Sequence, residues 1–280
     1  MKFTAGIDVG STYTKAVILT DDHQIVGTGM TKTGFKLVEA ARRAYETALT
    51  EAKLTEKEIA YLATTGYGRF LIPFRDVYVT DITAQSRGAQ FFFPQTRTVL
   101  DIGGQTMKAS RLDGDGKVKA FRLNDKCAAG TGAFLEKTAR YMNYQIEEIG
   151  PLVATSKEAV AISGVCAVFA ESEVINHVSA GATPADIMHG AIVSLVDRAV
   201  QLMKRVQAEP EYTLVGGILR FDTMARVVQN KLNAPVNVPP GAMPQFTAAI
   251  GAAILAHRRL QKLAAGGAIF ERDEVEAVAA

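Results

Sequence analysis

Hydrophobic residues recur along the chain with two periods, one typical of helices and one typical of strands. Residues 36–53 and 184–206 carry apolar side chains three or four positions apart, which predicts two amphipathic helices. Thr183 and Pro184 precede the second helix, as an N-cap and a proline at the first helical position. Strands are predicted at residues 60–64 and 212–215, and a closing helix at 248–263. Strands and helices that alternate in this way predict an α/β protein.

One pattern occurs twice. Residues 7–19 and 100–112 each contain an aspartate at the end of an apolar run, a glycine two residues later and a lysine seven residues after the aspartate. A turn signal and a further strand-like run follow each copy. Each copy therefore predicts a β-hairpin, and the duplication indicates two lobes of similar build.

The tight turns of these hairpins carry glycine and hydroxyl or amide residues. Such a turn points backbone N–H groups at an anion, and glycine lets a phosphate approach the chain closely. The aspartates, Asp8 and Asp101, can hold a hydrated magnesium ion. Two copies therefore predict lobes that grip one nucleotide from opposite sides. Gly216 and Gly217 follow a predicted strand and are expected to form a flat slot for adenine, although such a pair also occurs in ordinary turns.

The chain has two cysteines. Cys127 lies shortly before a predicted helix at 133–141, and Cys166 lies directly before a predicted helix at 167–178. A helix start favours the thiolate and offers N–H groups to cluster sulfurs. A cubane iron–sulfur cluster usually takes four thiolates, so two chains would have to share it. Zinc could use the same four thiolates, and two buried, inert thiols are the third reading.

Composition restricts the class of protein further. The 31 basic and 29 acidic residues nearly balance, which does not indicate binding to nucleic acid or to a membrane surface. The longest apolar stretches, 159–165 and 248–256, are too short to span a membrane. A strand-like run directly after Lys2 argues against a signal peptide, and we expect a cytoplasmic protein. The histidines, at positions 23, 177, 189 and 257, show no metal-ligand spacing.

With these motifs the chain resembles the BadF/BadG/BcrA/BcrD ATPase family. The resemblance rests on the two Asp-x-Gly loops and on the segments 124–132 and 166–173, and runs from about residue 6 to 255. It implies a two-lobed ATPase fold of the actin, Hsp70 and sugar-kinase type. We expect residues 1–95 with 247–263 to form the first lobe, residues 96–246 the second, and residues 264–280 a tail.

The resemblance also implies roles for individual residues. Asp8, Asp101 and Gln105 are expected to be catalytic, with both aspartates near Mg²⁺ and the glutamine placing a water. Cys127 and Cys166 are expected to bind a [4Fe–4S] cluster shared with a second chain. The residues expected to bind ATP or ADP are Gly10, Ser11, Thr12, Lys15, Gly103, Gly104, Gly130, Thr131, Gly132, Gly216 and Gly217.

The activity implied is ATP-gated electron transfer. Ferredoxin reduces the shared cluster, and hydrolysis drives the electron at low potential into substrate-reducing subunits. Activators of 2-hydroxyacyl-CoA dehydratases, which are homodimers, usually carry an acidic residue where this chain has Thr106. We therefore favour the smaller, D-type ATPase subunit of benzoyl-CoA reductase, an enzyme of anaerobic aromatic degradation, paired with a related ATPase subunit in a pseudo-symmetric hetero-oligomer.

Three alternatives stay open. A homodimeric dehydratase activator would share the fold and the cluster. A small-molecule kinase of the same superfamily needs a carboxylate base, and no Asp or Glu follows the second loop closely. An actin-like or chaperone-like binding module would have no use for two cysteines at helix starts.

Overall fold

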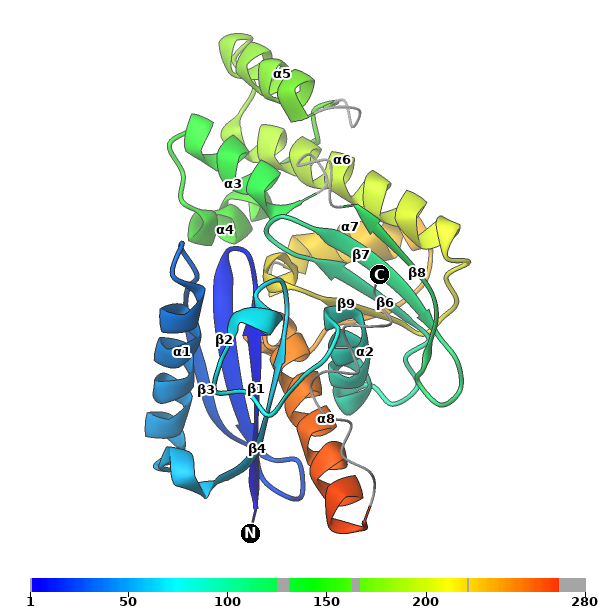
Figure 1. Cartoon of the computed structure of the whole chain (residues 1–280). Helices are drawn as coiled ribbons and strands as arrows, with labels where there is room; N and C mark the ends of the chain where they lie inside the picture. The colour runs from blue at the N-terminus through cyan, green and yellow to red at the C-terminus, as the bar shows by residue number, and fades with distance from the viewer. Residues whose placement is uncertain (1, 125–130, 163–166, 221, 267–280) are drawn as a thin grey trace, which may run out of the picture.

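Two five-stranded mixed sheets, each with helices on its faces, form the two halves of the molecule (Figure 1). The structure is a computed structural model that describes residues 2–124, 131–162, 167–220 and 222–266. The α/β fold with two lobes predicted from the repeat is confirmed. The lobe boundaries at residues 95, 96, 246 and 247 stay a prediction.

The first sheet has the strand order β3-β2-β1-β4-β5. Its strands are β1 (Phe3–Val9), β2 (Tyr13–Leu19), β3 (Ile25–Lys32), β4 (Ile59–Thr65) and β5 (Val77–Tyr78). Strands β1 and β2 form the predicted antiparallel hairpin, and β4 lies parallel to β1 on the other side. The strand predicted at 60–64 is thus the parallel neighbour of the first hairpin.

The second sheet repeats this order as β8-β7-β6-β9-β10. Its strands are β6 (Thr98–Ile102), β7 (Met107–Leu112), β8 (Val118–Asn124), β9 (Tyr212–Val215) and β10 (Val236–Asn237). Strands β6 and β7 form an antiparallel hairpin, and β9 lies parallel to β6. Hairpin and parallel neighbour therefore match in the two lobes, which confirms the duplication.

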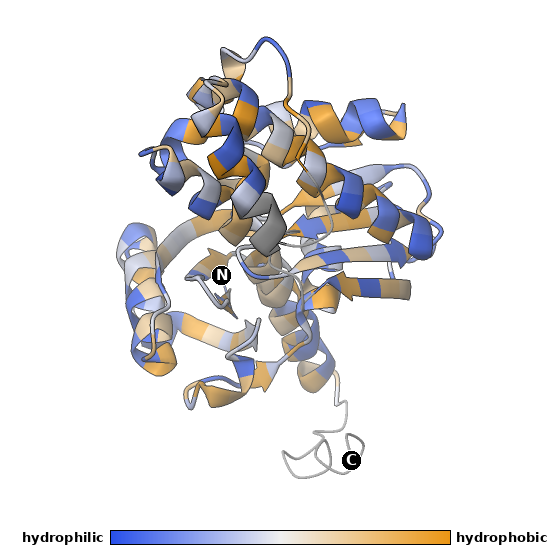
Figure 2. Cartoon of the chain, turned by 90° about the horizontal axis from the view of Figure 1, so that it is seen from above, coloured by the Kyte–Doolittle hydropathy of each residue, from blue (hydrophilic) through white to orange (hydrophobic). Residues whose placement is uncertain are grey.

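The helices cover both sheets. They are α1 (Leu37–Ala52), α2 (Asp81–Phe92), α3 (Gly132–Tyr141), α4 (Ile149–Ala154), α5 (Ala167–Ser179), α6 (Pro184–Arg205), α7 (Asp222–Leu232) and α8 (Thr247–Ala264). Hydrophilic and hydrophobic stretches alternate on the outer helices (Figure 2), as expected of helices with one face on a sheet. No helix among the described residues has the length and apolarity needed to cross a membrane.

Helix α2 is the element that connects the two halves. It packs along α8, which lies on the first sheet, and it also contacts strands β6 to β9 of the second sheet. The buried alanines Ala63, Ala84, Ala252 and Ala256 form a small cluster where β4, α2 and α8 meet. Small side chains let α2 and α8 approach closely, so a shift of α2 would displace atoms packed against both sheets.

The structure brings two histidines together that are far apart in the sequence. The rings of His23, in the turn after β2, and His257, on α8, meet edge to face with centroids 4.9 Å apart. His257 is buried and its Nε2 lies 2.8 Å from Nε2 of Gln261. Burial, with the positive charges that His257 and Arg258 can carry, lowers the pKa of His23 below its usual value.

This pair predicts acid sensitivity. An unfolded histidine titrates at about pH 6.5. Since the pKa of His23 is lower in the folded chain, the unfolded state binds protons first as the pH falls, and stability present above pH ~6.5 is lost below it. We expect the urea midpoint to fall between about pH 7.5 and 5.5, and to fall less in His23→Gln. An equal fall in both proteins would contradict this role.

Candidate functional site

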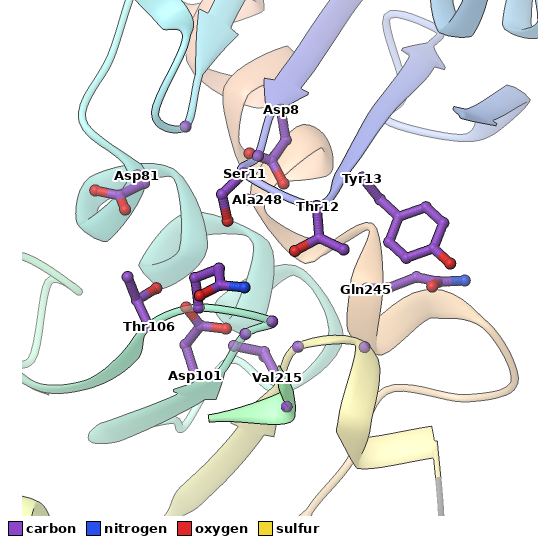
Figure 3. A pocket seen from close by; sticks show the side chains of 18 of the residues that line it. Asp8, Ser11, Thr12, Tyr13, Asp81, Asp101, Thr106, Val215, Gln245 and Ala248 are labelled. Carbon is purple, nitrogen blue, oxygen red and sulfur yellow. The ribbon is translucent and has the colours of Figure 1, made fainter. Parts of the chain in front are cut away.

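A cleft of about 660 Å³ opens between the lobes, a size typical of small-ligand sites. Both hairpin turns line it (Figure 3), with Asp8, Ser11 and Thr12 facing Asp101 and Thr106 across the cleft. The structure brings together these predicted residues in its lining: Asp8, Gly10, Ser11, Thr12, Lys15, Asp101, Gly103, Gly104, Gln105, Gly132, Gly216 and Gly217. Thr131 is buried as the N-cap residue of α3 and does not line the cavity. Cys127, Gly130 and Cys166 lie outside the described residues.

The spacing of seven between aspartate and lysine has a structural reason. In each hairpin the two residues are cross-strand partners, Asp8 with Lys15 and Asp101 with Lys108. Nζ of Lys15 lies 3.1 Å from Oδ2 of Asp8, and Nζ of Lys108 lies 3.2 Å from Oδ2 of Asp101. Each lobe therefore presents an aspartate–lysine ion pair to the cleft.

The second pair has additional partners that sequence reasoning missed. Oδ2 of Asp81, the first residue of α2, lies 2.7 Å from Nζ of Lys108. Gln85, one turn later, donates its Nε2 amide to Oδ2 of Asp101 at 2.7 Å. Asp81 lies before the second loop in the sequence, outside the stretch after that loop in which no Asp or Glu occurs. The sequence signal for it was Thr80, a residue type typical of helix N-caps, which would place Asp81 at the start of a helix.

Burial and charge set the protonation of this network. Burial raises the pKa of Asp101, against the opposing effects of Lys108 and Gln85. Burial alone would also raise the pKa of Asp81, but the Lys108 ammonium holds it below its usual value. Burial disfavours the charge on Lys108, yet Asp101 and Asp81 together raise its pKa. Lys108 is therefore a fixed cation shared by two carboxyl groups.

A glycine packs against the aspartate in each lobe. Gly66 follows β4 and Gly216 follows β9, the two parallel neighbours of the hairpins, and both have positive φ (86° and 106°). A Cβ at Gly66 would lie 2.4 Å from Oδ1 of Asp8, and one at Gly216 would lie 2.8 Å from Oδ1 of Asp101. Only glycine fits either position. Gly66 is thus the unpredicted counterpart of Gly216.

Helix α3 is fastened to the second hairpin turn. Gly132 and Ala133 donate their backbone N–H groups to the carbonyls of Gly103 and Gly104, at 2.9 and 2.8 Å. The second turn also touches the first, since a Cβ at Gly104 would lie 2.5 Å from Oγ1 of Thr12. A ligand that separates or draws together the two turns would therefore move the start of α3.

Gly217, Ile218 and Pro244 line another part of the cleft. A Cβ at Gly217 would meet Gln245 at 3.8 Å, an ordinary van der Waals contact, so the fold would accept a small side chain there. Ile218 and Pro244 add apolar surface, and Tyr13 lies near Gln245 in the view of Figure 3. An aromatic ring with polar edges, such as a purine, suits this surface. Tyr13 and Gln245 are further site residues that sequence reasoning did not identify.

The residues fit a nucleotide with its magnesium ion. Among the described residues no three His, Cys, Asp or Glu side chains gather to hold a metal alone. Asp8 and Asp101 each offer one carboxylate from opposite walls, as suits Mg²⁺, which keeps several waters and binds phosphate oxygens in addition. The lysines and the glycine turns suit phosphate. The arrangement can bind and polarise a polyphosphate chain.

The chain has relatives among known proteins. Residues 5–256 match the BadF/BadG/BcrA/BcrD ATPase family. The chain is 40% identical to the activator of lactoyl-CoA dehydratase from Anaerotignum propionicum, over 93% of this chain and 99% of that protein. It is 35% identical to the D-type subunit of benzoyl-CoA reductase from Thauera aromatica, over 94% of this chain and 96% of the relative.

A solved structure is similarly close. The activator of 2-hydroxyisocaproyl-CoA dehydratase from Clostridium difficile, with bound ADPNP, superposes with a TM-score of 0.90 at 35% identity, covering 96% of this chain and 99% of that one. The family match spans both lobes and every described residue of the cleft discussed above. The chain therefore belongs to the BadF/BadG/BcrA/BcrD ATPase family.

Proposed function

We propose that this protein hydrolyses ATP in the cleft and uses the energy to deliver an electron, at low potential, to a partner enzyme. The observation that supports it best is the attachment of α3 to the second hairpin turn through Gly132 and Ala133. Cys127 stands five residues before this helix in the sequence. A structural change at the bound phosphates would therefore be transmitted through helix α3 to the chain segment that contains Cys127.

The second cysteine precedes another helix of the same lobe. Helix α5 begins at Ala167, directly after Cys166, and contacts α3 and α6. The segment that leads towards it is held on α6 by Asp186, whose Oδ1 accepts the N–H groups of Lys157 and Glu158 at 2.9 and 3.1 Å. Two helices that follow the cysteines and share contacts in one lobe support a switch between two arrangements.

We propose that Cys127 and Cys166 supply half of the ligands of a [4Fe–4S] cluster, the other half coming from a second chain. When bound, the cluster supplies a one-electron redox centre that ferredoxin can reduce. The chain's own residues bind the nucleotide: Asp8 and Asp101 hold the hydrated magnesium ion, and Gln105, an exposed residue of the second turn, orients water. Two thiolates in each chain require a dimer.

The electron acceptor is an acyl-CoA enzyme. We propose a 2-hydroxyacyl-CoA dehydratase component as the acceptor, since the relative with 40% identity is named as a dehydratase activator. The substrate-reducing subunits of benzoyl-CoA reductase, with a related ATPase subunit as dimer partner, are the second candidate. Thr106, which lines the cleft, favours them, because the family resemblance implies that activators usually carry an acidic residue at this position. The relative from that reductase is 35% identical.

Cys127→Ser tests the cluster. Protein purified without oxygen, together with any partner chain, is expected to contain about four iron and four sulfide per two chains. The variant is expected to lose nearly all of both, because serine is a poor ligand for a cluster. ATP affinity, measured by calorimetry, should be unchanged.

The controls separate the alternatives. Wild-type protein that binds ATP but contains no iron would contradict the cluster, and stoichiometric zinc in its place would identify a zinc site. A Cys127→Ser variant with normal iron and weakened ATP binding would instead indicate a buried structural thiol. Partner enzymes that co-purify with the wild-type dimer distinguish dehydratase from reductase.

A further inference from the structure

The duplicated hairpins differ in one respect that their repeat does not explain. In the first lobe Lys15 pairs with Asp8 alone among the described ion pairs. In the second lobe Lys108 lies between two carboxylates, at 3.2 Å from Asp101 and 2.7 Å from Asp81. The shorter distance is to Asp81, which does not belong to the repeat.

Asp81 is held in place by the start of α2. Its Oδ1 accepts the N–H of Ile82 at 2.9 Å, and Thr80 caps the helix by accepting the N–H of Thr83. The unpaired N–H groups of a helix start favour a carboxylate in the first turn. The carboxylate is only one-quarter exposed, and Lys108 is 13% exposed, so solvent screens the pair weakly.

The ion pair joins a strand of the second sheet to the helix that connects the two halves. Lys108 belongs to β7 of the second sheet, whereas α2 packs mainly along α8, the helix that lies on the first sheet. Gln85 makes a second bond from the same helix to Asp101. The first two turns of α2 are thus attached to the second hairpin by two side chains, Asp81 through an ion pair and Gln85 through a neutral hydrogen-bond donor.

A polyphosphate would compete for this lysine. The charged side chains in the cleft lining are five acidic ones, Asp8, Asp81, Asp101, Glu136 and Glu147, and three basic ones, Lys15, Arg69 and Lys108. Both lysines are already paired with carboxylates, so phosphate oxygens that bind a lysine share it with a carboxylate or displace one. Lys108 can release Asp81 and still keep Asp101 as an ion-pair partner, whereas Lys15 has Asp8 as its one partner among the described ion pairs.

We propose that Asp81 is a positioning residue that holds Lys108 on helix α2 until the phosphates of the nucleotide take its place. The proposal deepens the proposed function, on which it rests, by assigning the contact through which nucleotide state reaches α2. Binding of phosphates releases one of two attachments between α2 and the second hairpin. The Gln85 attachment remains, so the helix is loosened and not detached.

Asp81→Asn tests the competition in the full-length protein. Removing the competing carboxylate is expected to tighten binding of ATP and ADP by about 5- to 10-fold, the effect of one partly buried ion pair. Adenosine has no phosphate to meet Lys108, and its affinity should be unchanged. All three dissociation constants are measured by calorimetry in one magnesium buffer.

Two further variants exclude a merely structural effect. Asp222→Asn removes the carboxylate of the first residue of α7, which is exposed and outside the cleft lining, and should leave all three affinities unchanged. Asp81→Glu keeps a carboxylate and should restore affinities near those of the wild type. Circular dichroism and urea midpoints confirm that each variant is folded.

The possible outcomes are distinct. Tighter ATP and ADP with unchanged adenosine supports the positioning role. Unchanged or weaker ATP binding in Asp81→Asn, or a change of equal size for all three ligands, overturns it while leaving the proposed function in place. Wild-type protein that binds neither ATP nor ADP overturns the proposed function together with this inference.

Discussion

Replacing Gly251 by alanine is expected to destabilise the protein by about 3 kcal/mol, the upper end of the cost of overpacking. Gly251 lies on α8 where this helix crosses α2. A Cβ there would lie 1.7 Å from the carbonyl oxygen of Ala84 and 2.8 Å from the amide nitrogen of Gly88. Both atoms belong to the backbone of α2, so no side-chain rotation can remove the clash and the helices must separate. Urea unfolding measured by circular dichroism gives the change in free energy.

The same substitution should weaken nucleotide binding, because α2 carries Asp81 and Gln85 to the second hairpin. Gly114→Ala is the matched control. Gly114 lies in the turn between β7 and β8, and the nearest atom to a Cβ there is a side-chain nitrogen of Arg97 at 3.5 Å, an ordinary contact. Equal urea midpoints for the two variants would contradict the close packing of α2 on α8.

The repeat was the part of the fold that the sequence predicted best. Asp8 with Lys15 and Asp101 with Lys108 have the same spacing, and a hairpin with a short turn must place residues at that spacing opposite each other. The chemistry of the turns followed from the same local pattern. Local pairing therefore made both the hairpins and most of the cleft predictable.

The positions that follow β4 and β9, the parallel neighbours of the two hairpins, could not be predicted from a local repeat. Gly66 and Gly216 occupy equivalent positions, but α1 lies between the first hairpin and β4, whereas α3 to α6 lie between the second hairpin and β9. The unequal insertions hide the correspondence in the sequence. Gly66 was accordingly missed, although Gly216 was predicted for a different reason, as an adenine slot.

Asp81 illustrates a second limit. Asp81 precedes the second loop in the sequence, and it reaches the cleft because α2 starts there and is held in place by α8. Such a contact depends on how helices pack in three dimensions. The histidine contact between His23 and His257 has the same origin.

Asp8→Asn is expected to lower the rate of ATP hydrolysis by about 100-fold or more, equivalent to about 3 kcal/mol of transition-state stabilisation. The carboxylate is buried and faces the second turn across the cleft. An amide binds Mg²⁺ less strongly than a carboxylate does, so more magnesium should be needed for half-maximal activity. The variant also leaves Lys15 without its ion-pair partner, and a small loss of stability should accompany the loss of rate.

Asp101→Asn is the informative comparison, because the two aspartates should act as a pair. If both lobes grip one nucleotide, each variant alone should lose most of the hydrolysis, and the double variant should lose little more, since residues that act as a unit are not additive. Asp101→Asn should cost less stability than Asp8→Asn, because Lys108 keeps Asp81 at 2.7 Å whereas Lys15 keeps no carboxylate partner among the ion pairs described. Steady-state phosphate release across a magnesium titration, with Asp222→Asn as control, measures these effects. Normal hydrolysis with unchanged magnesium dependence in Asp8→Asn would show that the first lobe does not hold the metal, since the duplicated aspartates would then have different roles.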